Sequence, residues 1–209
     1  MYPTKRYSTA AMLLIFAATW VSPAWPVEQA FHSSLTLVGF IGLWCFSKPL
    51  HLNNRDFLLV AIFLAVHSIA ARLLYSYVPY EAWGQNLFRF SINEHLGWSR
   101  NNFDRLVHFL FGVCFTPGTV SYLMLKYRLR PRLAFYVAIS GVMIVSLWYE
   151  WFELAVALTM SVEDAESYNG QQGDVWDAHK DMLMATLGSL AWAWSYRGMG
   201  SEVGKRAGV

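Results

Sequence analysis

The stretch LAFYVAISGVMIVSLWYEWFELAVALTM, residues 133–160, decides the fold of this chain. It is apolar almost all the way round a helix, and its two charged side chains are Glu150 and Glu153. A helix needs about 20 predominantly apolar residues to cross the hydrocarbon core of a bilayer. A helix in a soluble domain needs only one apolar stripe. The stretch therefore predicts a transmembrane helix with two acids toward its C-terminal end.

Five further apolar stretches accompany this one along the 209 residues. We expect transmembrane helices over Ser8–Ala24, Glu28–Phe46, Phe57–Val78, Asp104–Leu125, Leu133–Met160 and Asp177–Tyr196. Only 14% of the residues are charged, against roughly 25% in soluble domains. No internal repeat or flexible linker divides the chain. The sequence predicts an all-α fold, a polytopic membrane helical bundle of about six transmembrane helices, with residues 1–209 in a single integral-membrane domain.

The first stretch has a second interpretation. Lys5 and Arg6 precede an apolar run that ends in Ser-Pro-Ala at residues 22–24, a pattern similar to a signal-peptidase site. Pro23 and Pro26 crowd that site, and we favour a retained membrane helix.

The distribution of Lys and Arg predicts the orientation, because loops on the cytoplasmic side carry an excess of both. Of 16 basic residues, a cytoplasmic N-terminus places eleven inside and four outside, with Arg72 within the third stretch. The inside set is Lys5, Arg6, Lys48, Arg55, Lys126, Arg128, Arg130, Arg132, Arg197, Lys205 and Arg206. The outside set is Arg89, Arg100, Arg105 and Lys180. Both termini are expected to be cytoplasmic.

Composition also excludes some partners. A formal net charge of +2, without a basic stripe interleaved with aromatic residues, argues against nucleic acid. The two cysteines, Cys45 and Cys114, lie in apolar segments without the spacing of a metal or redox pair.

Topology brings six titratable side chains to one face of the membrane. In an up-and-down bundle, the start of an even-numbered helix lies at the same face as the end of an odd-numbered one. Charged groups at membrane depth are costly and usually functional. The six side chains form three helical pairs: Asp104 with His108, Glu150 with Glu153, and Asp177 with Asp181.

These residues differ in how easily a structural role explains them. Asp104 lies in a first helical turn, where a carboxylate stabilises the helix dipole. His108 lies one turn deeper, and a lone histidine is more often a hydrogen-bonded core residue than a ligand. Glu150 lies near a helix C-terminus, where the dipole disfavours an acid, so it is the most diagnostic residue. A structural ion pair between helices is the alternative for Glu150.

Two cations are candidates to accompany the acids. Arg72 lies in the outer half of the third stretch, where it can either reach the interface or neutralise the acidic cluster. We favour the second role. Arg105 follows Asp104 directly. Of the two acids that open the last stretch, Asp181 lies a full turn inside and is harder than Asp177 to explain as a helix cap.

The chain resembles the YjdF-like family of bacterial inner-membrane proteins over nearly its whole length. The stretches that carry the resemblance are NFDRLVHF at residues 102–109, YEWFE at 149–153 and GQQGDVWDAHKDM at 170–182. The resemblance implies a multi-pass protein of the bacterial inner (cytoplasmic) membrane. It implies no particular reaction.

The second half is more distantly similar to VanZ-type membrane proteins, which are linked to glycopeptide-antibiotic tolerance. Those proteins have an Asp-Lys-x-x-His-Phe helix start, a later helix with Glu, and an Asp-x-x-x-Asn helix near a Gly. The comparable positions are Asp104, Arg105, His108, Phe109, Glu150 or Glu153, Asp181 and Gly188. Arg105 stands where those proteins usually have Lys, and Met182 or a neighbouring residue stands in place of their Asn.

Two functions fit these residues. One is an enzyme acting on envelope lipids or lipid-linked substrates at the outer leaflet, assisted by Mg²⁺ or Mn²⁺ because hard carboxylate oxygens suit those ions. Its metal ligands are drawn from Asp104, Glu150, Glu153, Asp177 and Asp181. Its catalytic residues are His108, as acid and base, with Glu150 and Asp181, while Arg72 or Arg105 binds a phosphate. The other is a non-enzymatic membrane protein that binds a lipid, an ion or a small molecule. The four residues Asp104, His108, Glu150 and Asp181 are expected to line one cavity open to the outer face.

Overall fold

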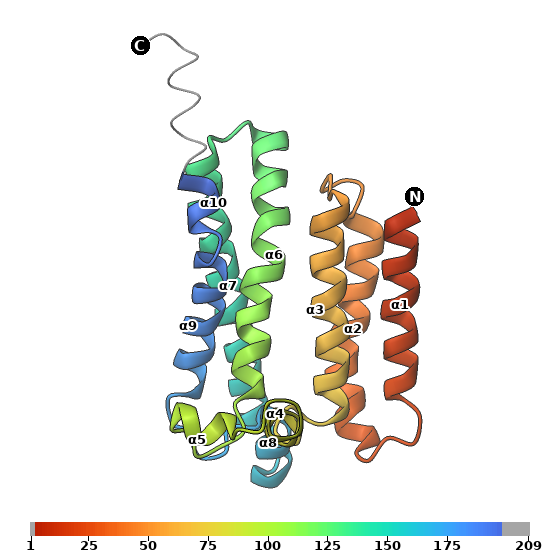
Figure 1. Cartoon of the computed structure of the whole chain (residues 1–209), viewed down its shortest axis with the longest axis vertical. Helices are drawn as coiled ribbons and strands as arrows, with labels where there is room; N and C mark the ends of the chain where they lie inside the picture. The colour runs from red at the N-terminus through yellow and green to blue at the C-terminus, as the bar shows by residue number, and fades with distance from the viewer. Residues whose placement is uncertain (1–2, 198–209) are drawn as a thin grey trace.

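The computed structural model describes residues 3–197, and over this range it contains α-helices and no strand. Figure 1 shows the longer helices side by side and the short helices α4, α5 and α8 gathered at one end of the bundle. We call this the α8 end and the opposite one the α10 end. The helices are α1 (Pro3–Thr19), α2 (Pro26–Phe46), α3 (Asn54–Arg72), α4 (Tyr80–Phe88), α5 (Ile92–Leu96), α6 (Phe103–Tyr127), α7 (Pro131–Thr159), α8 (Val162–Asn169), α9 (Asp177–Leu190) and α10 (Ala193–Arg197).

A helical membrane bundle is confirmed. Within residues 3–197, four helices are long and apolar enough to cross a membrane: α2, α3, α6 and α7. The helices α1 and α9 have 17 and 14 residues and run beside the four (Figure 1). The number of six transmembrane helices stays a prediction.

The third helix ends earlier than predicted, at Arg72 and not at Val78. Leu74 and Tyr75 have left-handed backbone conformations, with φ of 45° and 56°. Non-glycine residues adopt this region infrequently, and two in succession end a helix. The resulting turn holds Tyr75 beside the bundle, where its ring contacts His67 and His32.

The last predicted helix, Asp177–Tyr196, is interrupted. α9 ends at Leu190, and the short α10 begins at Ala193. The Ser189 hydroxyl donates back to the Ala185 carbonyl, and Trp192 N–H bonds the Ser189 carbonyl three residues earlier. Hydroxyl groups bonded back to the preceding turn bend helices, and a three-residue bond tightens the last turn.

Trp192 at this break compensates for a proline in α6. Pro117 lies inside α6 and lacks the N–H that would bond the Val113 carbonyl four residues earlier. The indole Nε1 of Trp192 donates to this carbonyl at 2.9 Å. A free backbone carbonyl at membrane depth is costly, so this bond ties the end of α9 to the middle of α6.

α6 and α9 pack through their backbones. A Cβ on Gly188 would lie 2.0 Å from the Phe109 carbonyl oxygen, and one on Gly112 would lie 2.0 Å from the Ala185 carbonyl oxygen. One turn further along, Thr116 donates to Ser189 at 2.8 Å. Small residues permit this approach in membranes.

The two halves of the bundle meet where α3 packs on α6. Phe63 of α3 contacts Phe111 and Phe115 of α6, with ring centroids 5.8 and 5.2 Å apart. On the far side of α3, α1 and α2 complete the first half, with Met12 and Phe40 in its core.

The α10 end also contains a buried acid. Asp56 in the first turn of α3 is fully buried, and its carboxylate accepts hydrogen bonds from Arg55, Asn53 and Ser121. Asp56 is an N-terminal helix acid whose charge is neutralised locally.

We expect Gly188→Ala to destabilise the protein by about 1–3 kcal/mol or more, because its methyl group cannot fit without separating α6 from α9. Gly141→Ala on α7 is the matched control, since no atom lies within 4 Å of the added Cβ. Thermal unfolding of the detergent-purified protein measures both. Equal melting temperatures for the two variants would contradict the backbone contact.

Trp192→Phe should destabilise the protein by about 1–3 kcal/mol, because it leaves the Val113 carbonyl without a donor. Adding Pro117→Ala restores an amide that can bond this carbonyl, so the double variant should recover most of the loss. The measurement is again thermal unfolding, read as a double-mutant cycle. Additive losses would show that the indole acts only through packing.

Candidate functional site

Three helices carry the predicted acids to the α8 end. α6 and α9 both begin there, whereas α7 runs the opposite way and brings its later turns alongside them (Figure 1). Asp104 and Asp177 lie in the first turns of α6 and α9. The helix dipoles stabilise carboxylates at both positions.

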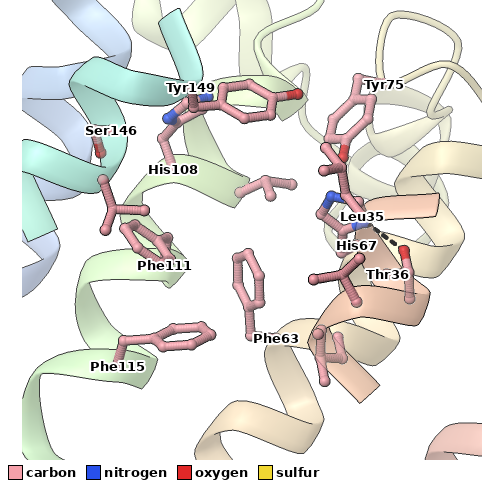
Figure 2. Close-up of a pocket in the computed structure, with 15 residues that line it drawn as sticks. Leu35, Thr36, Phe63, His67, Tyr75, His108, Phe111, Phe115, Ser146 and Tyr149 are labelled. Carbon is pink, nitrogen blue, oxygen red and sulfur yellow. Dashed lines mark hydrogen bonds between the residues drawn. The ribbon is translucent and has the colours of Figure 1, made fainter. Parts of the chain in front are cut away.

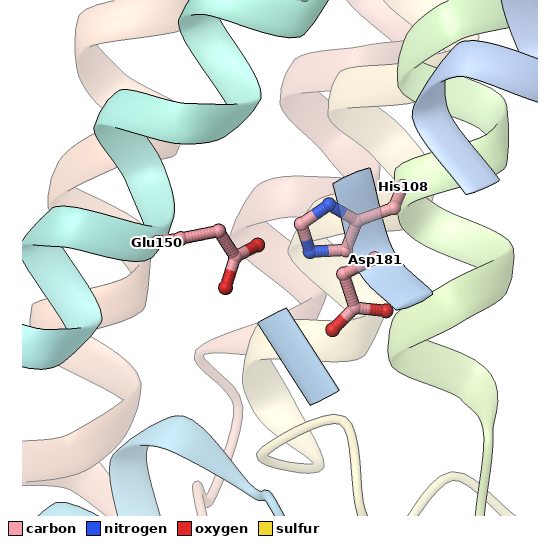
Figure 3. A group of neighbouring side chains, drawn as sticks. All are labelled: His108, Glu150 and Asp181. Carbon is pink, nitrogen blue, oxygen red and sulfur yellow. The ribbon is translucent and has the colours of Figure 1, made fainter. Parts of the chain in front are cut away.

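His108, Glu150 and Asp181 converge from three helices. One nitrogen of the imidazole and one oxygen of each carboxyl group lie within 4.8 Å of one another. Figure 3 shows the three side chains directed toward a common point. Glu150 is 7% exposed and Asp181 is 3% exposed. Neither Glu150 Oε1 nor Asp181 Oδ1 has a hydrogen-bond partner among the residues that the structure describes.

A second group shares Asp181. Oxygens of Asp104, Asp177 and Asp181 also lie within 4.8 Å of one another. Two members of this group are already paired with cations. Arg100 contacts Asp104 and lies 2.8 Å from Asp177, while Arg105 lies 3.4 Å from Asp177.

Arg100 is a site residue that the sequence analysis missed. Its guanidinium also donates to the Gln171 carbonyl, so it connects α6, α9 and the loop after α8. Burial works against the charged form, yet the carboxylates of Asp104 and Asp177 outweigh it and raise the pKa of Arg100. The signal in the sequence is the position of Arg100, four residues before Asp104. This spacing brings the two side chains together only if the chain already forms a helical turn before α6 begins.

Asp174 holds the loop before α9 in place. It accepts hydrogen bonds from Lys180 at 2.6 Å, from the Trp176 amide at 3.0 Å and from Arg105. These donors, Lys180 first, outweigh partial burial and lower the pKa of the Asp174 carboxyl below its usual value. Asp174 is therefore a structural anchor with no free oxygen for a ligand.

The same loop closes over the site from the α8 end. The Gln172 side chain donates to the Asn101 carbonyl at 2.9 Å and accepts from the Asn101 amide at 3.1 Å. Gly170 has a φ of 65° and lies so close to the Ser76 hydroxyl that a Cβ would be 2.7 Å from it. The segment at residues 170–174 thus contacts both the turn after α3 and the entry to α6.

Charge at this end does not balance among residues 3–197. The site contains six carboxyl groups, those of Asp104, Glu150, Glu153, Asp174, Asp177 and Asp181, and three cations, Arg100, Arg105 and Lys180. All three cations pair with Asp104, Asp174 or Asp177. The unpaired acids are therefore Glu150, Glu153 and Asp181.

Glu153 lies at the edge of the cluster, one turn from Glu150. Its carboxyl group is close enough to interact electrostatically with Glu150, Asp181 and Tyr168, and its backbone carbonyl accepts from Asn169 at 3.1 Å. It belongs to neither group of three whose ligand atoms lie together. The structure thus brings Asp104, His108, Glu150 and Asp181 together, with Glu153 beside them.

Arg72 does not neutralise the cluster. Its guanidinium donates to the carbonyls of Thr19, Val21 and Ser22, at the end of α1 and in the turn that follows. Terminal carbonyls of a helix need donors, and a cation there is stabilised by the dipole. The preference for Arg72 as the counter-charge was wrong, because α1 lies nearer to it than the acids do.

A mostly apolar cavity lies between the two halves of the bundle, beside the acids. It has a volume of about 320 Å³ and is enclosed by α2, α3, α6, α7 and the turn at Tyr75. Figure 2 shows His108 and Tyr149 on one side and His67 and Tyr75 on the other. Of the four residues predicted to line one cavity, His108 does so, whereas Asp104, Glu150 and Asp181 pack behind it. A single cavity that all four residues line stays a prediction.

Comparison with known proteins identifies the family. A family described as "Predicted membrane protein (DUF2238)" matches residues 4–201. The chain belongs to this family. It is also 38% identical over 105 residues to the "Inner membrane protein YjdF" of Escherichia coli K12.

That alignment covers 48% of each chain, so this chain matches about half the length of its relative. The predicted YjdF-like resemblance is confirmed, and the VanZ-type resemblance stays a prediction. No solved structure matches the chain. Membership in this membrane-protein family agrees with the four apolar helices.

Proposed function

We propose that this family member is a metal-assisted enzyme that acts on an envelope lipid or a lipid-linked substrate at the outer leaflet. One observation carries the proposal. Glu150 and Asp181 are buried and unpaired with any cation in residues 3–197, each has one oxygen without a hydrogen-bond partner, and both carboxyl groups lie beside His108. Two buried carboxylates without cations are strongly unfavourable. A divalent ion bound between them removes this cost.

The donor set indicates the ion. Two carboxylates and one imidazole suit Mn²⁺, and the carboxylates suit Mg²⁺. His108, Glu150 and Asp181 are the proposed ligands. Asp104 and Asp177 are the second choice, because Arg100 and Arg105 compete for their oxygens. A metal ion here would polarise a phosphoryl oxygen or lower the pKa of a bound water.

A non-enzymatic binding protein is the alternative, since the same ligands would hold an ion or an anionic headgroup without turnover. Aromatic and basic residues around the α8 end favour contact with lipid in either case. Exposed Trp83, Leu87 and Phe88 on α4 lie at this end. Such side chains settle at the bilayer interface.

We further propose that the chain lies in the bacterial inner membrane with both termini in the cytoplasm. Its E. coli relative is called an inner membrane protein. The basic α6–α7 connection lies at the α10 end with the start of α1, as an inside loop would. Reporter fusions at Tyr127 should therefore read cytoplasmic and fusions at Asn169 should read external. The reverse pattern would refute this orientation and move the acidic site to the inner leaflet.

Metal binding is tested with detergent-purified protein and Mn²⁺. We expect near-stoichiometric Mn²⁺ by electron paramagnetic resonance and a melting temperature that Mn²⁺ raises and chelator lowers. Glu150→Gln and Asp181→Asn should abolish both effects, because each removes a charged ligand. Glu163→Gln on exposed α8 is the matched control and should behave as wild type. A melting temperature indifferent to Mn²⁺ in wild type would overturn the metal site.

Turnover separates the two functions. With Mn²⁺, the wild type should release phosphate or headgroup from phosphatidylglycerol or from a polyprenyl diphosphate, and His108→Gln should lose this release. Metal binding without release from any lipid phosphate would favour the binding protein.

A further inference from the structure

We propose that the cavity between the two halves of the bundle holds the hydrocarbon chain of a membrane lipid, which enters sideways between α2 and α7. The inference rests on the proposed function in one respect, since it identifies the bound chain with the lipid part of the substrate. It depends on the cavity and its rim, and on neither the metal nor the acids.

The walls of the cavity suit a hydrocarbon chain. Phe63, Phe111 and Phe115 enclose its deeper end, and Leu64 and Val107 extend the apolar surface (Figure 2). A volume of about 320 Å³ lies at the lower end of the range of ligand pockets, roughly 300–1,000 Å³. This volume accommodates one chain and excludes a complete lipid with its headgroup.

The rim of the cavity faces the surroundings of the bundle. Val38 of α2 and Val145 of α7 both line the cavity, and they are 66% and 53% exposed. α2 packs on α3, and α7 packs on α6 and α9, but α2 and α7 are not among the closely packed pairs of residues 3–197. Since α2 and α7 both qualify as membrane-crossing helices, the gap between them opens toward lipid and not toward water.

Polar groups are concentrated at the other end of the cavity. Thr36 bonds the His67 ring at 2.9 Å, and the His108 and Tyr149 rings lie 5.7 Å apart in an edge-on contact. From His108 to Phe115 the cavity follows α6 for seven residues, roughly 10 Å at about 1.5 Å per residue. A chain lying along this length would end beneath the imidazole that also faces Glu150 and Asp181.

His108 is therefore the link between the chain pocket and the acids. The His108 imidazole borders the apolar cavity on one side and the carboxyl groups of Glu150 and Asp181 on the other. When the chain of a lipid occupies the cavity, the bond that joins the headgroup to the rest of the lipid would lie near His108. The substrate class is then an amphiphile with at least one long chain, not a free headgroup.

Photolabelling of the full chain tests the proposal. The protein is reconstituted in phosphatidylglycerol vesicles that contain a phosphatidylglycerol with a diazirine midway along one acyl chain. We expect label on Phe111 or Phe115 after irradiation and peptide mapping. Val38→Trp with Val145→Trp fills the rim and should reduce this label several-fold. Ile41→Trp with Ile144→Trp is the matched control, because both positions are exposed on the same helices and outside the cavity.

A second probe identifies the source of the chain. An isoprenoid phosphate with the same diazirine is tested in parallel, and stronger labelling of Phe111 or Phe115 by one probe assigns the chain type. Label confined to the outward faces of α2 and α7 with both probes would overturn the proposal. So would cavity labelling that the rim variants leave unchanged.

The Glu150→Gln variant distinguishes this inference from the proposed function. It should lose Mn²⁺ and keep the cavity label. Absence of Mn²⁺ binding in wild type, together with a rim-sensitive label, would refute the metal enzyme and retain the chain pocket. Mn²⁺ binding without label in the cavity would retain the metal site and refute the chain pocket.

Discussion

The contact between the backbones of α6 and α9 determines the geometry of the rest of the site. Gly112 and Gly188 allow the two helices to touch without intervening side chains. Both helices run in the same direction from the α8 end, so their N-termini lie together and their partial positive charges add. Asp104 and Asp177 occupy these first turns. The distance between the acids of the two helices is thus set by two residues that have no side chain.

Among the acids of α6, α9 and the loop before α9, pairing decreases with distance from the α8 end. Asp174, in the loop, accepts from three donors. Asp104 and Asp177, in the first turns, pair with arginines. Asp181 lies one turn further in and Glu150 faces it, and neither has a cation in residues 3–197. Two buried carboxyl groups are therefore left without a cation among residues 3–197.

Sequence alone predicted the helical membrane bundle and the convergence of its acids, because topology depends on apolar length and helix direction. Glu150 was recognisable since neither capping nor the helix dipole favours an acid at its position. Arg100 was missed because it precedes α6, and a loop residue has no predictable direction before the loop is folded. Arg72 was misassigned for a related reason: its partners are backbone carbonyls, which leave no mark in a sequence. The predicted helix Asp177–Tyr196 is interrupted where Trp192 bonds α6, and periodicity along a single segment cannot reveal a contact with another helix.

A purely structural ion-pair network would have a different distribution of charge. Acids that only hold helices together are paired, since removing one partner of a buried pair costs several kcal/mol, and α6 and α9 are already joined by their glycines. Glu150 and Asp181 are not part of that contact, yet each has an oxygen without a partner and lies beside His108. The same imidazole borders the apolar cavity. A residue that lies between two carboxyl groups without cations and a lipid-sized space has the position expected of a metal ligand next to the chain of the substrate.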